Sequence, residues 1–287
     1  MGADMTTTLP FTPSFSKKVA SVDGSLVFPE TSGHRTWFSP DAVNWAPTAW
    51  PDWVIDDGYP LSYKVHFNGE MWYFGTAADS YYFDFVKSSD FLHWTHVGAF
   101  EGPSPETPIN NFFTNMLLVA HGGALRAFRM KSASFVTAYS STDGITWATH
   151  ETNLPYNFYI AKIVSFGGSL YAIPKGLASY KAVYRSDDNG LTWTLLTSDW
   201  GIPDSTLIDC IATTEGLLAV FTDKETWASN DGVAWTKKAY TLPSGSDVLN
   251  NGVILPLGSD LFMVGCGTTQ KNVFKLVEAS GPVGIPL

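Results

Sequence analysis

The sequence is short of cysteine, arginine and long apolar runs, and the first two shortages each exclude a class of site. Its two cysteines, Cys210 and Cys266, lie far apart and lack the paired spacing of a zinc or CxxC site, so we interpret both as buried thiols. Arginine is rare among the 17 basic residues, and 27 acidic residues leave a net charge of −10. This balance argues against a nucleic-acid partner, because phosphate binding depends on clustered basic side chains.

The third shortage concerns membranes and export. No run of about 18 apolar residues is present, so the sequence predicts no membrane-inserted helix. The first ten residues, MGADMTTTLP, also lack the basic and apolar regions of a secretory signal. The 287 residues are nevertheless 45% hydrophobic and 15% aromatic, which is enough for a large core. We therefore expect a globular protein without an export signal.

The clearest pattern that is present is a repeat of Ser-x-Asp followed by Trp. The tryptophans of this box are 49, 53, 46 and 42 residues apart, which is the spacing of propeller blades. The five boxes contain Ser39, Asp41 and Trp45; Ser88, Asp90 and Trp94; Ser141, Asp143 and Trp147; Ser186, Asp188 and Trp193; and Ser229, Asp231 and Trp235. Ser and Asp can accept hydrogen bonds from the backbone of a turn, and the Trp ring can cover it. Because equivalent carboxylates on different blades cannot converge on one substrate, we predict that the box residues are structural.

A second repeat counts six units. Each unit is a predicted β-hairpin, with two apolar strands joined by a turn that contains Gly, Asn or Asp. The hairpins begin near residues 18, 61, 116, 161, 207 and 253. A third strand would end in each box and a fourth would start at its Trp. The sequence therefore predicts an all-β fold, a six-bladed β-propeller of four-stranded antiparallel blades that forms one domain over residues 1–287.

The sixth unit has no box and no clear fourth strand. An open ring would leave the edge strand of this blade unpaired. The segment before the first hairpin, within residues 1–15, is the available donor, and we expect residues 6–15 to supply the outer strand. Pro10 and Pro13 fit only an edge position. A loose N-terminal tail is the alternative.

The boxes resemble the Asp-box, or bacterial neuraminidase repeat, of sialidase-type propellers. Ser186, Asp188, Gly190, Thr192 and Trp193 meet its pattern Ser-x-Asp-x-Gly-x-Thr-Trp letter for letter. The box from Ser88 to Trp94 also resembles a structural turn of furanosidase-type propellers. The resemblance implies a fold and not an activity, since such propellers include non-catalytic glycan-binding, receptor and phage-tail proteins.

The chain departs from the sialidases of this family in its arginines. The resemblance would imply an arginine triad that clamps the substrate carboxylate, a Tyr–Glu nucleophile pair and an Asp acid/base. The arginines of this chain are Arg35, Arg126, Arg129 and Arg185, and Tyr171-Ala172-Ile173-Pro174 has Ala where the family's Arg-Ile-Pro segment has Arg. We interpret Arg126 and Arg185 as blade-surface residues. Without bidentate recognition of a carboxylate, sialidase activity is not expected.

Binding is expected on the face opposite the boxes, where loops join the blades. These loops combine aromatic rings with Asp, Glu and Asn, which suits sugar rings, a protein interface or a capped channel. The candidate ligand-binding residues are Trp50, Trp53, Tyr59, Asn110, Asn111, Tyr156, Asn157, Tyr159 and Trp200. A glycosidase would need two opposed carboxyl groups from among Asp56, Asp57, Glu106, Asp204 and Asp247. No cofactor or metal is predicted, with calcium on these acidic loops kept as an alternative.

Composition gives an indirect indication of function. A Trp-, Tyr-, Thr- and Gly-rich propeller that is poor in Lys is typical of proteins that work outside cells, yet no signal peptide is apparent. Both facts fit a phage virion protein of the tail, fibre or capsid surface. We therefore expect a non-enzymatic propeller that docks to virion proteins or to host surface glycan. A glycoside hydrolase is the first alternative, and a lectin is the second.

Overall fold

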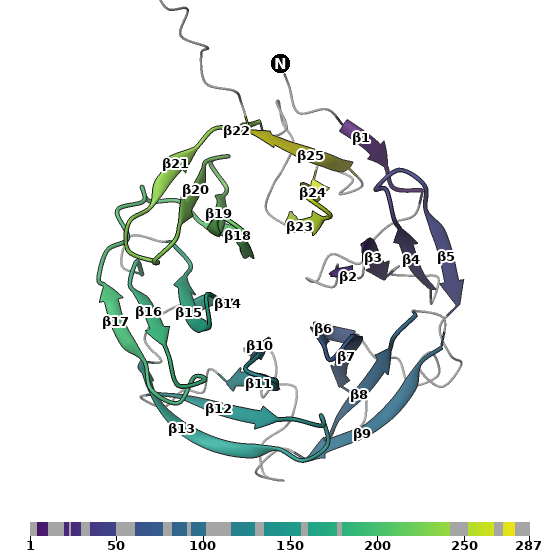
Figure 1. Cartoon of the computed structure of the whole chain (residues 1–287), viewed down its shortest axis with the longest axis horizontal. Coiled ribbons are helices and arrows are strands. Elements are labelled where there is room, and N and C mark those ends of the chain that lie inside the picture. Colours follow the sequence, from purple (N-terminus) through teal and green to yellow (C-terminus); the bar gives the residue numbers. More distant parts are fainter. Residues whose placement is uncertain are drawn as a thin grey trace, which may run out of the picture.

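The described residues form a ring of β-sheets (Figure 1). The computed structural model describes residues 5–10, 20–22, 24–29, 35–49, 61–76, 82–90, 93–101, 116–129, 135–155, 160–176, 180–241, 252–266 and 272–278. Within these ranges no helix is long and apolar enough to cross a membrane. Six antiparallel sheets follow one another around a central axis, which confirms the predicted six-bladed β-propeller.

Five of the blades are four-stranded meanders in chain order. Blades 1 and 2 consist of β2 (Ala20–Val22), β3 (Ser25–Pro29), β4 (Arg35–Ser39) and β5 (Ala46–Ala49), then β6 (Leu61–Phe67), β7 (Glu70–Thr76), β8 (Tyr82–Ser88) and β9 (Thr95–Glu101). Blade 3 consists of β10 (Met116–His121), β11 (Ala124–Arg129), β12 (Phe135–Ser141) and β13 (Ala148–Pro155). Blades 4 and 5 consist of β14 (Ile160–Phe166), β15 (Ser169–Pro174), β16 (Val183–Ser186) and β17 (Thr194–Thr197), then β18 (Leu207–Thr213), β19 (Gly216–Phe221), β20 (Thr226–Ser229) and β21 (Thr236–Lys238).

The boxes mark the strand ends as the sequence predicts. In all five of these blades the third strand ends at the box Ser, as β12 does at Ser141 and β16 does at Ser186. The fourth strand begins at the residue after the box Trp, as β17 does at Thr194. The repeat therefore predicted where the outer hairpin of each blade turns.

Blade 6 is built differently, from β23 (Val253–Leu257), β24 (Asp260–Cys266) and β25 (Asn272–Glu278). Its outer edge is paired by β1 (Met5–Thr8), with Thr8 opposite Asn272 and Met5 opposite Phe274. A second short strand, β22 (Tyr240–Thr241), pairs with the other end of β25. The predicted N-terminal closure is confirmed, although the strand ends before Pro10, and Pro13 lies outside the described residues.

The turn between the first and second strands of a blade and the box turn between its third and fourth strands share one face of the ring. Leu125, next to the β10–β11 turn, lies opposite the box residue Ser141, and Leu170 lies opposite Ser186 in the next blade. We call the face that carries these hairpin turns and the boxes the box face. The opposite face, where the chain passes from blade to blade, is called the linker face.

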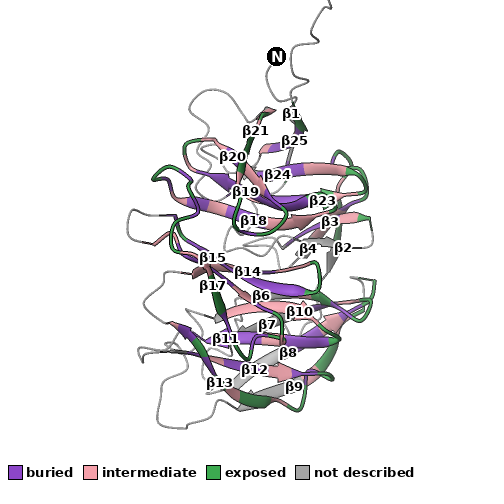
Figure 2. Cartoon of the chain, turned by 60° about the vertical axis from the view of Figure 1, so that its left-hand side comes forward, coloured by how far each residue is buried: buried purple, intermediate pink, exposed green. Residues whose placement is uncertain are grey.

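Burial is highest in the second strands of the blades and lowest in the outer strands (Figure 2). Every residue of β15 and β19 is buried, because both faces of these second strands are covered by neighbouring blades. The outer strand β17 is partly exposed along its whole length. The second strands β15 and β19 are therefore buried on both faces, whereas no residue of the outer strand β17 is buried.

The core consists of clusters that lie between blades. One cluster joins blades 2 and 3 through Phe67, Trp72 and Leu125. Equivalent clusters lie between blades 3 and 4, 4 and 5, 5 and 6, and 6 and 1. The last of these contains Leu9, which is 2% exposed and follows the closing strand β1. Ring closure is thus supported by burial as well as by strand pairing.

Candidate functional site

The box turns contain the most regular polar geometry of the molecule. In the box of blade 3, Asp143 Oδ1 accepts hydrogen bonds from the backbone N–H groups of Ile145 and Thr146, both at 2.8 Å. Ser141 Oγ donates to the same carboxylate at 2.9 Å and accepts from the N–H of Gly144 at 2.8 Å. One Ser–Asp pair therefore satisfies three N–H groups that no strand ladder reaches.

The same bonds recur in the other boxes. The Ser hydroxyl donates to the Asp carboxylate in every one, with distances from 2.8 to 3.2 Å. The Asp also accepts a backbone N–H in every box, from Asn44, His93, Thr146, Thr192 and Ala234. These bonds account for the carboxylates within their turns. That the boxes have no other role remains a prediction.

The box Trp and Gly bind the turn to the preceding blade. In blades 3, 4 and 5 the indole Nε1 donates to the carbonyl of the box Gly at 3.0 to 3.1 Å. Gly144 has φ +76°, and a Cβ there would lie 2.2 Å from Trp72 Cζ3 of blade 2. A Cβ on Gly190 would similarly lie 2.5 Å from Phe128 Cζ of blade 3. Glycine is therefore required both for the left-handed conformation and for the close approach of the blades.

The hydrogen bonds keep the box carboxylates ionised. Backbone N–H bonds from Thr146 and Ile145 lower the pKa of Asp143 to about 2. Backbone bonds from Asn44 and Val43 lower the pKa of Asp41 as well. In Asp188 burial raises the pKa, but the hydrogen bonds from Thr192 and Ser186 outweigh it and the net shift is downward. A group with a lowered pKa cannot act as a general acid near neutral pH.

A second polar cluster lies on the inner strands of blades 4, 5 and 6. Asp209 of β18, whose side chain is 7% exposed, forms an ion pair and hydrogen bond with Lys162 of β14. The other carboxylate oxygen accepts the backbone N–H of Ile254 at 3.0 Å, in β23. Asp209 thus joins three consecutive blades near the axis. The Asp209 carboxylate stabilises the ring only while its partners are present, because loss of one partner would leave a buried charge uncompensated.

The sequence did not identify Lys162 and Asp209 as a pair. Both stand four positions before the last residue of their inner strand, Phe166 and Thr213. Irregular strand register precedes each of them, between Ile160 and Lys162 in one strand. An alignment of the hairpins on their turns would have placed opposite charges at equivalent positions of neighbouring blades.

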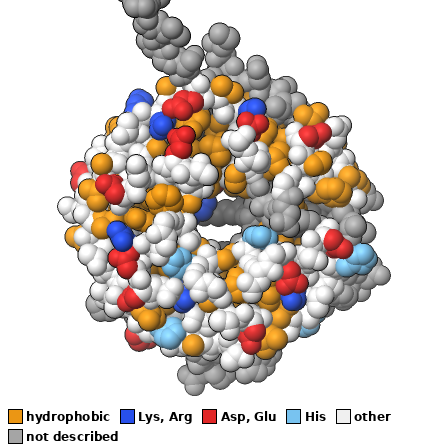
Figure 3. All heavy atoms as spheres, in the orientation of Figure 1, with side chains coloured by type: hydrophobic (Ala, Val, Ile, Leu, Met, Phe, Trp, Pro, Cys, Tyr) orange, Lys and Arg blue, Asp and Glu red, His pale blue; other side chains and the backbone are white. Residues whose placement is uncertain are grey.

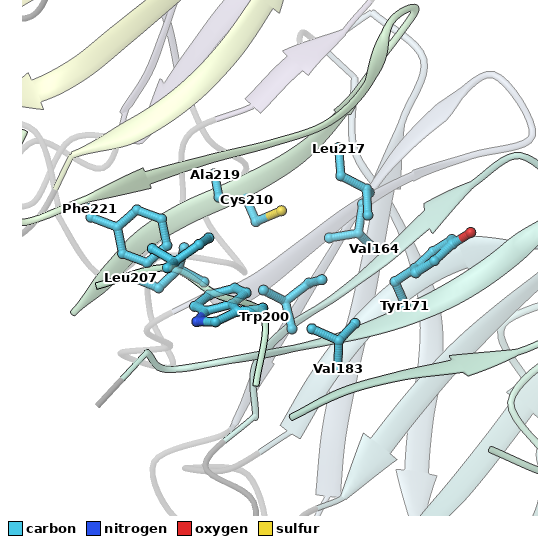
Figure 4. Close-up of a cluster of buried hydrophobic side chains, with 11 residues drawn as sticks. Val164, Tyr171, Val183, Trp200, Leu207, Cys210, Leu217, Ala219 and Phe221 are labelled. Atoms are coloured by element: carbon cyan, nitrogen blue, oxygen red, sulfur yellow. The ribbon is translucent and has the colours of Figure 1, made fainter. Parts of the chain in front are cut away.

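The structure places Trp200, a predicted ligand-binding residue, in the core and not on an exposed surface. Trp200 is 2% exposed and belongs to the cluster between blades 4 and 5 (Figure 4). Its ring centroid lies 5.4 Å from that of Phe221 and 5.5 Å from that of Trp235. The loop from Asp199 onward folds back over the blades, and the large apolar ring is buried with the core because the aromatic surfaces of two blades meet there.

Asp204 is the one catalytic candidate in the described part of the chain. It lies in the loop between blades 4 and 5, with its side chain 61% exposed, and forms an ion pair with Lys181 Nζ at 2.6 Å. The other acidic candidates, Asp56, Asp57, Glu106 and Asp247, lie outside the described residues. So do the ligand-binding candidates Trp50, Trp53, Tyr59, Asn110, Asn111, Tyr156, Asn157 and Tyr159.

The described residues contain no group of three His, Cys, Asp or Glu side chains that could hold a metal ion. The Asp56-Asp57 segment, on which the calcium alternative rests, is outside this set. Of the two cysteines, Cys210 is free and fully buried, and burial raises the pKa of its thiol to about 12. Such a thiol is unreactive, in agreement with its interpretation as a small core residue.

Arg126, Arg129 and Arg185, the arginines whose side chains the structure describes, are arranged unlike a carboxylate clamp. Arg126 and Arg129 lie on the same strand, β11, at an odd separation, so their side chains point to opposite faces of the blade. Arg129 is buried, and Arg185 pairs with Asp187 at 2.7 Å in blade 4. The predicted surface position suits Arg185, which is 40% exposed, whereas Arg126 is only partly exposed and faces the neighbouring blade.

Comparison with known proteins identifies the fold. No protein-family model matches the chain, and no curated protein matches its sequence. An α-L-arabinanase from Penicillium chrysogenum, complexed with arabinobiose, is 13% identical with a TM-score of 0.61, over 97% of this chain and 98% of that one. YCF48 bound to D1 peptide is 12% identical with a TM-score of 0.53, over 96% of both chains.

A mutant Trypanosoma rangeli sialidase with trans-sialidase activity is also similar. It is 12% identical with a TM-score of 0.53 over 96% of this chain, which spans 57% of the sialidase chain. At such identities the likeness shows the fold alone. The architecture is therefore that of a six-bladed propeller with structural neighbours among sialidase-like propellers, and these neighbours include both hydrolases and a protein bound to a peptide.

Proposed function

We propose that this protein is a non-enzymatic binding propeller that docks to a glycan or a protein through its linker face. The supporting observation is the state of the described carboxylates. Glycoside hydrolysis needs one carboxylic acid that stays protonated near neutral pH and a second carboxylate opposite it. Every described Asp or Glu with a shifted pKa has a lowered one, through turn N–H groups in Asp143 and through Lys237 in Glu225.

The box face and the linker face differ in the side chains that are candidates for binding a ligand. On the box face the five boxes use their Ser and Asp groups within the turns. The sequence between the blades, which we expect on the linker face, combines Trp, Tyr and Asn outside the repeated strands. Rings and amides in that arrangement suit sugar faces and peptide groups alike. Two of the similar structures hold such ligands, arabinobiose in the arabinanase and the D1 peptide in YCF48.

The narrower proposal is a virion protein that works outside the cell. It rests on composition alone, and the comparisons with known structures add nothing to it. A virion protein should sediment with assembled particles in a density gradient. Recovery of the chain as a free protein from the cell extract, and never with particles, would contradict the virion assignment but not the binding function.

The binding function is tested by a glycan array together with assays for product release. We expect saturable binding without release of product from sialosides, arabinosides or other common glycosides. Replacing Trp53, Tyr59 or Tyr156 by Ala should weaken attachment and leave the melting temperature unchanged. Ile145→Ala is the matched control, because Ile145 is a 60% exposed side chain on the box face.

The hydrolase alternative has its own decisive outcome. If the protein turned over any glycoside, the next experiment would replace five residues one at a time: Asp56, Asp57, Glu106, Asp204 and Asp247. Loss of turnover in one of these variants, with folding retained, would replace the binding proposal by a glycosidase. A lectin would show the same array result as our proposal but no association with particles.

A further inference from the structure

The junction of blades 3 and 4 on the box face contains polar groups that no turn or ion pair accounts for. His121 is the last residue of β10, and its Nδ1 atom lies 2.8 Å from Ser165 Oγ of β14 in a hydrogen bond. Arg126 of β11 donates from Nε to the carbonyl of His121 at 3.3 Å. The bond from Nε fixes the guanidinium beside the His–Ser pair, and its two terminal NH₂ groups have no hydrogen-bond partner among the described residues. Figure 3 shows that one face of the ring carries Lys or Arg, Asp or Glu, and His side chains around the central opening.

Arg126 differs from the basic residues of the next blade. Arg185, Lys181 and Lys162 of blade 4 each form an ion pair with an Asp. Within the described ranges, no ion pair is formed by Arg126, and burial lowers the pKa of its guanidinium with no carboxylate to offset it. Partly buried charges in proteins are normally paired, because desolvation is costly. In a chain of net charge −10 an unpaired guanidinium indicates that the matching anion comes from elsewhere.

Two hairpin turns that contain glycines with positive φ flank Arg126. A Cβ added to Gly123, Gly167 or Gly168, in the two hairpin turns that flank the site, would meet nothing within 4 Å. A Cβ on Gly122 would lie 2.4 Å from Asn189 Oδ1 and 3.8 Å from an Arg126 Nη atom. The amide of Asn189 and the guanidinium thus approach the same point.

The net charge of the site favours an anion with a single negative charge. Burial and the neighbouring Arg126 lower the pKa of His121, so its ring is neutral at pH 7. The site therefore carries a single positive charge, from a guanidinium whose planar donor fork matches the two oxygens of a carboxylate. A phosphate dianion would leave one negative charge uncompensated inside an acidic protein. A singly charged carboxylate is the better match.

We propose that Arg126, Asn189, Ser165 and His121 form a binding site for the carboxylate of a small ligand such as a uronic acid. Arg126 pairs with the carboxylate, and the amide, hydroxyl and imidazole groups bind hydroxyls next to it. The site lies on the box face between two blades, so it is separate from the linker-face aromatics. We expect a Trp53→Ala variant to keep the Arg126 site intact. Failure of the Arg126 site and failure of the linker-face proposal therefore give different results.

The test compares two probes that differ in the carboxylate, methyl glucuronide and methyl glucoside. Binding is followed by NMR of the histidine rings at constant ionic strength, with the His121 signals assigned from a His121→Gln variant. We expect a saturable shift with the glucuronide and none with the glucoside. Equal shifts with both sugars, or equally tight binding of inorganic phosphate, would overturn the carboxylate assignment.

Two variants locate the binding at Arg126. Arg126→Gln should weaken glucuronide binding at least tenfold, because the charged donor fork is lost. Arg185→Gln is the matched control, since Arg185 is already paired with Asp187 at 2.7 Å, and it should bind as the wild type does. Unchanged binding by Arg126→Gln would overturn the proposal.

Asn189→Asp keeps the proposal testable if Arg126→Gln does not fold. Asp tolerates the positive φ of 65° found at Asn189 and would place a carboxylate beside Arg126. We expect this variant to melt at a higher temperature than the wild type and to lose glucuronide binding through internal competition. Wild-type affinity in a folded Asn189→Asp protein would show that the ligand does not meet Arg126.

Discussion

Blade 4 and blade 6 obtain the strand that covers their outer edge in different ways. Both need a fourth strand that covers the outer edge of the sheet, since unpaired edges invite aggregation. Blade 4 makes its own strand, β17, and joins it to β16 through a box held by Ser186 and Asp188. Blade 6 has no box and instead pairs β25 with β1 from the chain start and with β22 from blade 5.

The difference shows which part of the sequence specifies the outer edge of each blade. The edge of blade 4 is specified locally, because a turn of eight residues satisfies its own N–H groups. The edge of blade 6 depends on two segments that are far apart in the sequence and on the burial of Leu9 between blades 6 and 1. We expect the box blades to tolerate damage at one residue, and blade 6 to fail when its borrowed strand is lost.

Removal of residues 1–10 should have the largest effect. It deletes β1, leaves the Asn272–Phe274 edge unpaired and removes Leu9 from the core. Loss of a buried leucine side chain alone costs about 2 to 5 kcal/mol, and the exposed edge should add association of chains. Urea denaturation should show lower stability, and size-exclusion chromatography should show oligomers.

Thr7→Pro separates strand pairing from packing in this experiment. Thr7 lies opposite Val273 in the ladder, so a proline there disrupts the backbone pairing and retains Leu9. We expect an intermediate loss of stability. A truncated chain that stays monomeric with the wild-type denaturation curve would show that β1 does not close the ring.

The elements that were predictable are those with local causes. Each third strand ends at its box Ser because the turn that follows is specified by the Ser and Asp themselves. Closure by the N-terminal segment was predictable because a blade without a fourth strand needs one. The contribution of β22 was not predictable, since Tyr240 and Thr241 form too short a strand to give a periodic signal.

The candidate site was less predictable because its contacts cross between blades. Trp200, within Asp-Trp-Gly-Ile-Pro, has the neighbours of an exposed loop residue, and only the packing of Phe221 and Trp235 around it shows that it is core. The Lys162–Asp209 pair joins residues that a hairpin pattern treats separately. An unpaired charge such as Arg126 can be recognised only when all of its neighbours are in place.

A smaller effect is expected from a single box residue. Asp188→Ala removes the acceptor of Thr192 N–H at 2.8 Å, of Thr192 Oγ at 2.5 Å and of the Ser186 hydroxyl. Loss of a charged acceptor in a partly buried turn should cost about 1 to 3 kcal/mol. Urea denaturation should show this cost as a lower midpoint with an unchanged slope.

The matched control lies in the blade without a box. Asp260→Ala removes a carboxylate of blade 6 that forms a surface ion pair with Lys275 at 2.6 Å. Exposed pairs of this kind contribute about 0 to 1 kcal/mol. Equal effects of the two substitutions would mean that the box carboxylate is no more important to its blade than a surface charge.

The smallest effect concerns acid sensitivity, which should be a property of the boxes. Backbone hydrogen bonds lower the pKa of Asp143 from 3.8 in the unfolded chain to about 2 in the fold. Its contribution to stability is therefore complete above the unfolded pKa and is lost as the pH falls through the folded pKa. The stability advantage of wild type over Asp143→Asn should shrink between pH 6 and pH 3, as measured by urea denaturation at each pH. Thr142→Ala, an exposed neighbour without a titrating group, should follow the wild type. A constant difference between wild type and Asp143→Asn over this range would show that the carboxylate does not hold its turn as an ion.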